Sequence, residues 1–217
     1  MTGFFTKITQ VNFMAAKYKN NNIRYEQTNR IIEKFLYDLK FQKNINFYLE
    51  TCNVNAVCAA IEAVNNNFYV NIPKLENKPI MSQADLMFCY IYQNEDEMPV
   101  HDKGLCENEV IENLAYAAEK LAHVNADVVY TNTKDELSLL AEEILKTKNA
   151  AIVLSYQDEK TPGHYITIVD VNKEGFIYFD PWGKNPRNKN GGNFEVFKFD
   201  EFKKCNKMRM IVITDKS

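Results

Sequence analysis

The sequence lacks the features of a disulfide-stabilised, membrane-spanning or polyanion-binding protein. Its five cysteines are odd in number and include no CxxC pair, which favours free thiols in a reducing compartment over a disulfide framework. No window approaches the roughly 18 apolar residues of a membrane span, and the N-terminus has no signal-peptide core. We therefore expect a cytoplasmic protein without an integral membrane segment, released by lysis or a non-classical route if it acts outside. The net charge of −3, without a dense basic patch, predicts no nucleic-acid partner.

The composition is that of one globular domain. The chain has 217 residues, of which 46% are hydrophobic and 12% aromatic, so it can bury a core without covalent crosslinks. There is no internal repeat, and the one biased segment is the polar stretch KNPRNKNGGN at 184–193, which is typical of a loop. These features predict a single domain over residues 1–217, with a helical N-terminal extension over 1–40.

The first two thirds of the chain have helical periodicity. Apolar residues recur at the spacing of one helix face, and two of these stretches open with capping-box sequences, SQAD and TKDE. The predicted helices cover residues 23–40, 53–64, 82–92, 110–121 and 133–144.

Near residue 150 the pattern changes to β-branched and aromatic runs that are typical of strands. A helical front half followed by a sheet-forming back half predicts the α+β class, with the front helices packed on an antiparallel sheet. The predicted strands cover residues 150–156, 164–171, 176–180, 194–199 and 208–214, with one short strand at 127–131 among the helices.

The stretch GHYITIVDVNKEGFIYFDPWG predicts a β-hairpin with His164 at its start and Asp180 at its end. The turn is Asn172 to Gly175, with glycine at the place where a positive φ is easiest. Counting back from this turn leaves Asp180 two or three residues short of pairing with His164, so a bulge, strand twist or the reach of the imidazole must close the gap. An imidazole held beside a carboxylate is the base and orienting half of a catalytic triad.

Cys52 is the candidate nucleophile because it immediately precedes the apolar helix predicted for 53–64. The unpaired N–H groups and the positive dipole end of a helix N-terminus stabilise a thiolate, and a nearby imidazolium favours it further. The same N–H groups can bind the oxyanion of an acyl-transfer intermediate. Cys58 lies within the apolar stripe and is interpreted as a core residue.

Three segments together resemble the papain-like cysteine peptidases, and more narrowly their bacteriocin-processing (double-glycine-peptidase-like) branch. They are TCNVNAVCAAIEAV, TPGHYITIVDVNKEGFIYFDPWG and FKFDEFKKC, in that order. The resemblance implies a papain-like α+β fold with residues 41–217 as the catalytic core. It implies Cys52 as nucleophile, His164 as general base and acid, and Asp180 as the residue that orients the imidazole. It further implies cleavage of a peptide or amide bond through an acyl-enzyme, with no metal or organic cofactor.

The oxyanion donor has two candidates. The family places a glutamine several residues before the cysteine; here Asn46 has the papain-like spacing, while Gln42 has the expected residue type ten positions before Cys52. The sequence departs from the family in having Asn-Val-Asn at 53–55 in place of Gly-Pro-Thr/Ser. Trp182 resembles the tryptophan that shields the His–carboxylate contact in this family, although a core role fits it equally well.

The substrate class remains open between peptides, proteins and peptidoglycan crosslinks, the last for an enzyme of phage or bacterial origin. Two other functions remain open as well, a catalytically silent binding module and a cysteine-dependent acyltransferase or transglutaminase-like enzyme. A zinc site formed by Cys89, His101 and Cys106 is disfavoured, because their spacing matches no common zinc motif.

Overall fold

The structure is a computed structural model, and it describes residues 52–65, 87, 90–91, 111–131, 133–159, 161–181 and 195–216. The predictions for helices at 23–40 and 82–92, for the extension over 1–40 and for the loop at 184–193 lie outside these residues, apart from short helical pieces at Met87 and 90–91.

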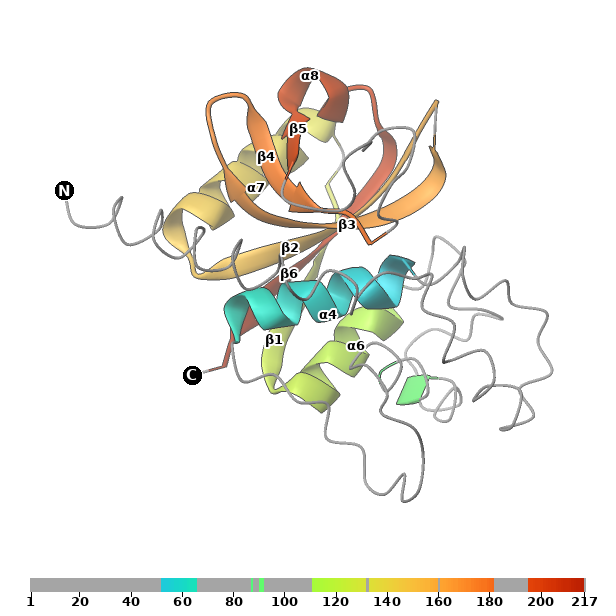
Figure 1. The fold of residues 1–217 in the computed structure, drawn as a ribbon, viewed down its shortest axis with the longest axis vertical. Helices are drawn as coiled ribbons and strands as arrows, with labels where there is room; N and C mark the ends of the chain where they lie inside the picture. Colours follow the sequence, from blue (N-terminus) through green and yellow to red (C-terminus); the bar gives the residue numbers. More distant parts are fainter. Residues whose placement is uncertain are drawn as a thin grey trace.

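One six-stranded antiparallel sheet organises the described part of the chain (Figure 1). Its strand order is β1-β6-β2-β3-β4-β5, so the last strand of the chain lies inside the sheet between β1 and β2. The coarse α+β prediction is therefore confirmed. The strands are β1 (Val124–Val129), β2 (Ala150–Asp158), β3 (Thr161–Val171), β4 (Gly175–Phe179), β5 (Glu195–Lys198) and β6 (Asn206–Asp215).

Helices cover both faces of the sheet, and each face has its own apolar core (Figure 1). On one face α4 (Cys52–Val64) and α6 (Ile111–Ala122) pack on alternate side chains of β2, β3 and β6. On the other face α7 (Lys134–Thr147) and the short α8 (Phe199–Phe202) cover the intervening side chains. Because successive strand residues point to opposite faces, a sheet covered on both sides needs apolar residues in nearly continuous runs. The sequences AAIVLSY and MIVIT at β2 and β6 meet this requirement.

The strand predicted at 127–131 is wrong in its boundaries, because β1 covers Val124–Val129. The reason lies at His123, whose φ of 54° is in the left-handed region. A residue in this conformation ends α6 and turns the chain within a single position, so the strand begins directly afterwards. The sequence gives no glycine or asparagine at this position to indicate such a short connection.

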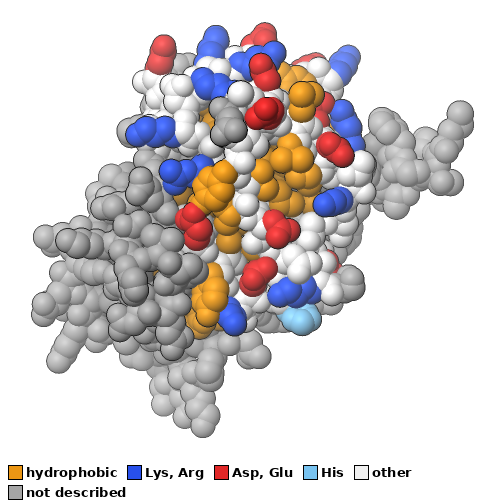
Figure 2. Space-filling view, turned by 180° about the vertical axis from the view of Figure 1, so that it is seen from behind, with side chains coloured by type: hydrophobic (Ala, Val, Ile, Leu, Met, Phe, Trp, Pro, Cys, Tyr) orange, Lys and Arg blue, Asp and Glu red, His pale blue; other side chains and the backbone are white. Residues whose placement is uncertain are grey.

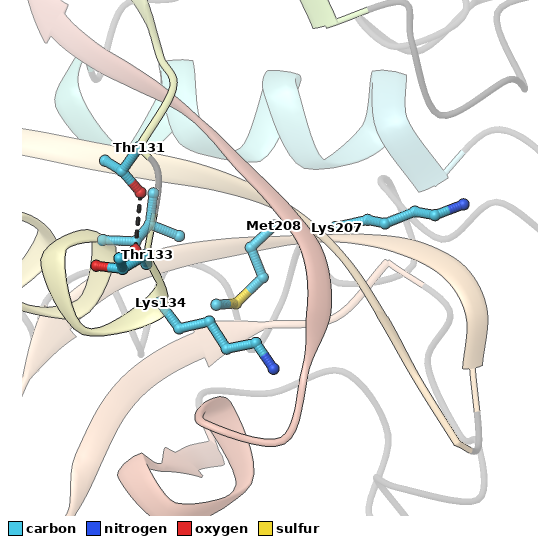
Figure 3. Close-up of a pocket in the computed structure, with 6 residues that line it drawn as sticks. Thr131, Thr133, Lys134, Lys207 and Met208 are labelled. Atoms are coloured by element: carbon cyan, nitrogen blue, oxygen red, sulfur yellow. Dashed lines mark hydrogen bonds between the residues drawn. The ribbon is translucent and has the colours of Figure 1, made fainter.

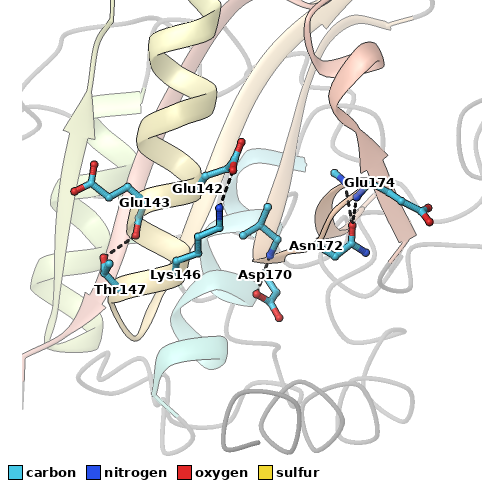
Figure 4. A network of polar contacts seen from close by, with 9 residues as sticks. Glu142, Glu143, Lys146, Thr147, Asp170, Asn172 and Glu174 are labelled. Atoms are coloured by element: carbon cyan, nitrogen blue, oxygen red, sulfur yellow. Dashed lines mark hydrogen bonds and ion pairs between the residues drawn. The ribbon is translucent and has the colours of Figure 1, made fainter. Parts of the chain in front are cut away.

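Of the two hydrogen bonds in the capping box predicted for α7, the structure shows the one accepted by the Thr133 side chain. The Thr133 hydroxyl accepts a hydrogen bond from the Glu136 backbone N–H at 3.2 Å. The solvent face of this helix carries an ion pair between Lys146 and Glu142 at 2.9 Å, and the Thr147 hydroxyl donates to the Glu143 carbonyl (Figure 4). The helix extends to Thr147, three residues further than predicted.

The predicted β3–β4 hairpin is confirmed, and an asparagine side chain holds its turn. The Asn172 carboxamide oxygen accepts from the backbone N–H groups of Glu174 (2.8 Å) and Gly175 (3.0 Å) (Figure 4). The Asn172 N–H closes the turn by donating to the Gly175 carbonyl at 2.9 Å. This is an Asx turn, in which the side chain replaces a backbone acceptor.

The reason predicted for glycine at 175 is wrong, because Gly175 does not have a positive φ. The constraint is space. A Cβ at this position would clash with the Phe197 carbonyl oxygen and lie 2.8 Å from the Lys198 Cα, both on neighbouring strand β5. A strand glycine with this environment marks a close approach of two backbones.

The described surface opposite the view of Figure 1 mixes basic and acidic side chains with scattered apolar ones and has no field of one sign (Figure 2). Among the described residues, the large hydrophobic side chains that are exposed include Tyr130 and Leu139. Isolated apolar residues of this kind are ordinary on protein surfaces.

Candidate active site

Helix α4 begins at Cys52, as the sequence predicts to within one residue, and all of its residues are buried. The Cys52 side chain is at the edge of the core, with 8% of the residue exposed, whereas Cys58 is fully buried. As the first helical residue, Cys52 has a backbone N–H without an intrahelical acceptor. The Val54 N–H, another donor in the first turn of the helix, is bound by the Asn53 carboxamide oxygen at 2.7 Å. The Asn-Val-Asn departure at 53–55 is thus compatible with a helix that starts at the cysteine.

His164 and Asp180 are in direct contact. The imidazole Nε2 lies 2.7 Å from the Asp180 Oδ1, and both residues are almost fully buried, with 3% and 1% exposed. A distance this short between a charged donor and a carboxylate is that of a charge-assisted hydrogen bond. The contact predicted from the hairpin is confirmed, and the catalytic role assigned to the two residues stays a prediction.

A β-bulge brings the two residues together. Near the turn, Val171 pairs with Phe176 and Asp170 with Ile177, and this register would place Asp180 opposite Thr167. The register shifts between Ile168 and Asp170, so Thr167 pairs with Phe179 instead. Asp180 consequently lies one residue closer to His164 than an unbroken ladder would allow. Two residues of offset remain, and the reach of the two side chains covers them.

The Cys52 thiol completes the arrangement, because it lies close enough to the His164 side chain to raise the pKa of the imidazole through hydrogen bonding and charge. Each ring nitrogen of an imidazole has one in-plane hydrogen-bonding position, and Asp180 occupies that of Nε2. We therefore assign the Cys52 contact to Nδ1. The three side chains come from α4, β3 and the residue that follows β4, so the fold brings together three positions that are far apart in the sequence.

The protonation of His164 reflects two opposing effects. Burial alone would lower its pKa, but the hydrogen bonds to Asp180 and Cys52 and the negative charge of both partners outweigh burial and raise the pKa from 6.5 to about 10. The favoured state of His164 at neutral pH is the imidazolium, which is held by Asp180 and lies beside the Cys52 thiol. A cysteine beside an imidazole that is held by an aspartate is the arrangement that nucleophilic catalysis by a thiol uses.

Two tyrosines border this cluster. Tyr156 pairs directly with His164 across β2 and β3, and its ring packs edge-on against the imidazole, with 6.0 Å between centroids. Tyr156 is fully buried, so it keeps water from that side of the imidazole. Tyr156 was not among the predicted site residues, and the available signal was its place at the end of the predicted strand that precedes His164.

Tyr165 is the second tyrosine, and its buried hydroxyl has no hydrogen bond of ordinary geometry. Ser155, its partner across the sheet, is close enough to lower the Tyr165 pKa, but burial dominates, and with the negative charge of Cys52 it raises that pKa to about 12. The phenol therefore stays protonated near the thiol. Sequence analysis did not identify Tyr165 because an alternating strand pattern gives an aromatic residue no role beyond packing.

Thr167 was also missed. Its hydroxyl donates a hydrogen bond of 2.7 Å to the Ala56 carbonyl of α4, and both groups are buried. A threonine in a β-rich run is typical of any strand, so the sequence carried no signal for this contact.

Several predicted site residues lie outside the part of the chain that the structure describes. They are both oxyanion candidates, Asn46 and Gln42, the shielding residue Trp182, and the residues of the disfavoured zinc site, Cys89, His101 and Cys106. Within the described ranges no group of three or more His, Cys, Asp or Glu side chains is arranged to hold a metal ion.

A cavity of about 230 Å³ lies between the start of α7 and the start of β6 (Figure 3). Thr133 and Lys134 line it on one side, and Lys207 and Met208 on the other. The Lys134 ammonium donates to the Asn206 carboxamide at 3.0 Å and to the Lys203 carbonyl at 3.3 Å. These bonds hold the lysine to the neighbouring loop, and none of the three candidate residues lines the cavity.

Comparison with protein-family models, curated proteins and solved structures gives no match to this chain. The interpretation of the site therefore depends on its own residues and geometry. None of the helices in the described ranges is long and apolar enough to cross a lipid bilayer.

Proposed function

We propose that this protein is a papain-like thiol hydrolase that cleaves a peptide or other amide bond. The observation that carries the proposal is the buried chain of contacts from Cys52 through His164 to Asp180, with 2.7 Å between His164 Nε2 and Asp180 Oδ1. A nucleophile at a helix N-terminus, a base in contact with it and a carboxylate behind the base are the parts that acyl transfer requires. The cysteine lies at the start of a helix, and this helix packs on the antiparallel sheet that carries the histidine. This arrangement also supports a papain-like fold.

In the first half of the reaction the Cys52 Sγ attacks the carbonyl carbon of the scissile amide. The negative charge that develops on the carbonyl oxygen is bound by the Cys52 backbone N–H and by an amide side chain, for which Asn46 and Gln42 are the candidates. His164 then gives its Nδ1 proton to the leaving nitrogen, so the amine departs neutral and a thioester remains on Cys52.

In the second half His164 acts as a base. It removes a proton from water, the resulting hydroxide attacks the thioester carbonyl, and the C–S bond breaks to release a carboxylic acid and the thiolate. Asp180 keeps the ring oriented and stabilises its positive charge in both halves. The mechanism uses no metal and no organic cofactor.

The proposal is tested by incubating the full chain with a peptide library and, separately, with purified peptidoglycan, and identifying cleavage products by mass spectrometry. The matched control is Cys52→Ala, which removes the sulfur and keeps a small apolar residue at the edge of the core. We expect cleavage by the wild-type chain in one of the two mixtures and none by the variant.

Three outcomes would contradict the proposal. Equal product formation by wild type and Cys52→Ala would exclude Cys52 as the nucleophile. An acyl-enzyme that is discharged by added amines but not by water would identify an acyltransferase instead. If neither mixture gives an acyl-enzyme or a product, a binding module becomes the better description.

A further inference from the structure

Thr167 lies where the three elements that carry Cys52, His164 and Asp180 meet. It is in β3, three residues after His164, and it pairs with Phe179, the residue before Asp180. Its hydroxyl reaches across to α4, where it donates to the Ala56 carbonyl at 2.7 Å. Ala56 is four residues, or about one helical turn, beyond Cys52.

Both ends of this bond are completely buried, with 0% of Thr167 and 0% of Ala56 exposed. The Ala56 carbonyl is in the interior of α4, where the helix itself uses one of its two lone pairs. The Thr167 hydroxyl binds in addition to the helical bond, so the contact is not needed to complete α4. It ties an already formed helix to the strand beneath it.

The surroundings explain why such a bond matters. The side of α4 around Ala56 is made of small side chains, and the core beneath it is apolar. Small apolar side chains attract a neighbouring surface without fixing its position along the surface, whereas a hydrogen bond is directional. A displacement of about 1 Å at reacting atoms can cost roughly 10²-fold in rate.

We propose that Thr167 is a positioning residue for the Cys52–His164 pair. Its hydroxyl fixes the depth and rotation of α4 against β3, and this places the Cys52 Sγ at the imidazole. The proposal rests on the proposed function, because it assigns the bond a role in the reactivity of the same cysteine. Thr167 contacts no reacting atom itself.

The test compares four side chains at position 167 in the full chain. Threonine and serine carry the hydroxyl, while Thr167→Val and Thr167→Ala lack it; valine matches threonine in shape, and alanine matches serine. The measurement is the rate at which iodoacetamide alkylates Cys52 as a function of pH, read by mass spectrometry, with the thermal midpoint of each variant recorded alongside. This readout needs no substrate.

We expect rapid labelling of Cys52 below neutral pH in wild type and Thr167→Ser. In Thr167→Val and Thr167→Ala we expect Cys52 to be labelled roughly tenfold more slowly at the same pH. If one hydroxyl-free variant fails to fold, the other keeps the comparison with its own matched partner. The proposal would be overturned if the labelling rates correlated with the thermal midpoints of the variants and not with the presence of the hydroxyl. It would also be overturned if Thr167→Val and Thr167→Ala were labelled as fast as wild type. Slow labelling of Cys52 in the wild-type chain would instead contradict the proposed function, so the two failures are distinguishable.

Discussion

The Nε2 of His164 lies 2.7 Å from the Oδ1 of Asp180, although an unbroken ladder from the hairpin turn would leave Asp180 three residues short of pairing with His164. The bulge at Val169 and the reach of the two side chains close this distance. Hydrogen bonding to Asp180 and the proximity of Cys52 outweigh the effect of burial and raise the pKa of the imidazole to about 10, so His164 is held in its protonated form.

Substitutions in the three residues should differ in severity. Cys52→Ala and His164→Ala should each abolish cleavage, because the nucleophile and the proton carrier have no substitute. Asp180→Asn should lower kcat by roughly 10³ to 10⁴ and leave measurable turnover, because it removes only the orienting charge. Steady-state kinetics on whichever substrate the library identifies would measure this. Full activity of His164→Ala would contradict the assignment.

The raised pKa of His164 predicts how stability changes with pH. The folded state holds this proton up to about pH 10, whereas the unfolded chain releases it near 6.5, so between these values the folded state binds more protons. The stabilisation is complete below pH 6.5 and is lost as pH rises towards 10. Urea unfolding across this range should show wild type losing stability relative to Asp180→Asn. Parallel curves for the two proteins would argue against a charged His164 in the fold.

Gly175→Ala should destabilise the hairpin. The added methyl would meet the backbone of β5, and backbone cannot move aside as a flexible side chain can. We expect a loss of about 1–3 kcal/mol in the free energy of unfolding. Lys173→Ala, at an exposed position in the same turn, is the control and should change it by no more than about 0.5 kcal/mol. If Gly175→Ala left the free energy of unfolding unchanged, β4 and β5 would have to lie further apart than they do in the structure.

Tyr165→Phe should be tolerated. The phenol hydroxyl is buried without a hydrogen bond of ordinary geometry, so removing it relieves a desolvation cost and leaves ring packing intact. The free energy of unfolding should stay unchanged or rise by up to about 1 kcal/mol. A fall of that size in urea unfolding would show that Ser155 holds the hydroxyl strongly.

Local patterns in the sequence predicted the coarse fold well. Periodicity identified α4, α6 and α7, and the TKDE sequence located the Thr133 cap, because these features depend on neighbours in the chain. The hairpin followed from β-rich runs on either side of Asn172. The boundaries of β1 were wrong because they depend on the left-handed conformation of His123, which is uncommon for a non-glycine residue and leaves no clear signal in the sequence.

The sequence predicted the members of the candidate site and the contact between His164 and Asp180, but not the register shift that produces this contact. Cys52, His164 and Asp180 could be identified from their order and from the elements they border. The bulge at Val169 could not, because a register shift is decided by packing on both faces of the sheet. Long-range contacts such as Thr167 to Ala56, 111 residues apart, leave no local pattern.

The pH dependence of Cys52 alkylation tests the central claim most directly, since it needs no knowledge of the substrate. Wild type and His164→Gln are treated briefly with iodoacetamide over a pH series, and labelling at each cysteine is quantified by mass spectrometry. The account predicts that Cys52 labels faster than the fully buried Cys58 and Cys205, that its rate persists below neutral pH, and that His164→Gln removes this acid-side reactivity. Preferential labelling of another cysteine, or a Cys52 profile that His164→Gln leaves unchanged, would contradict it.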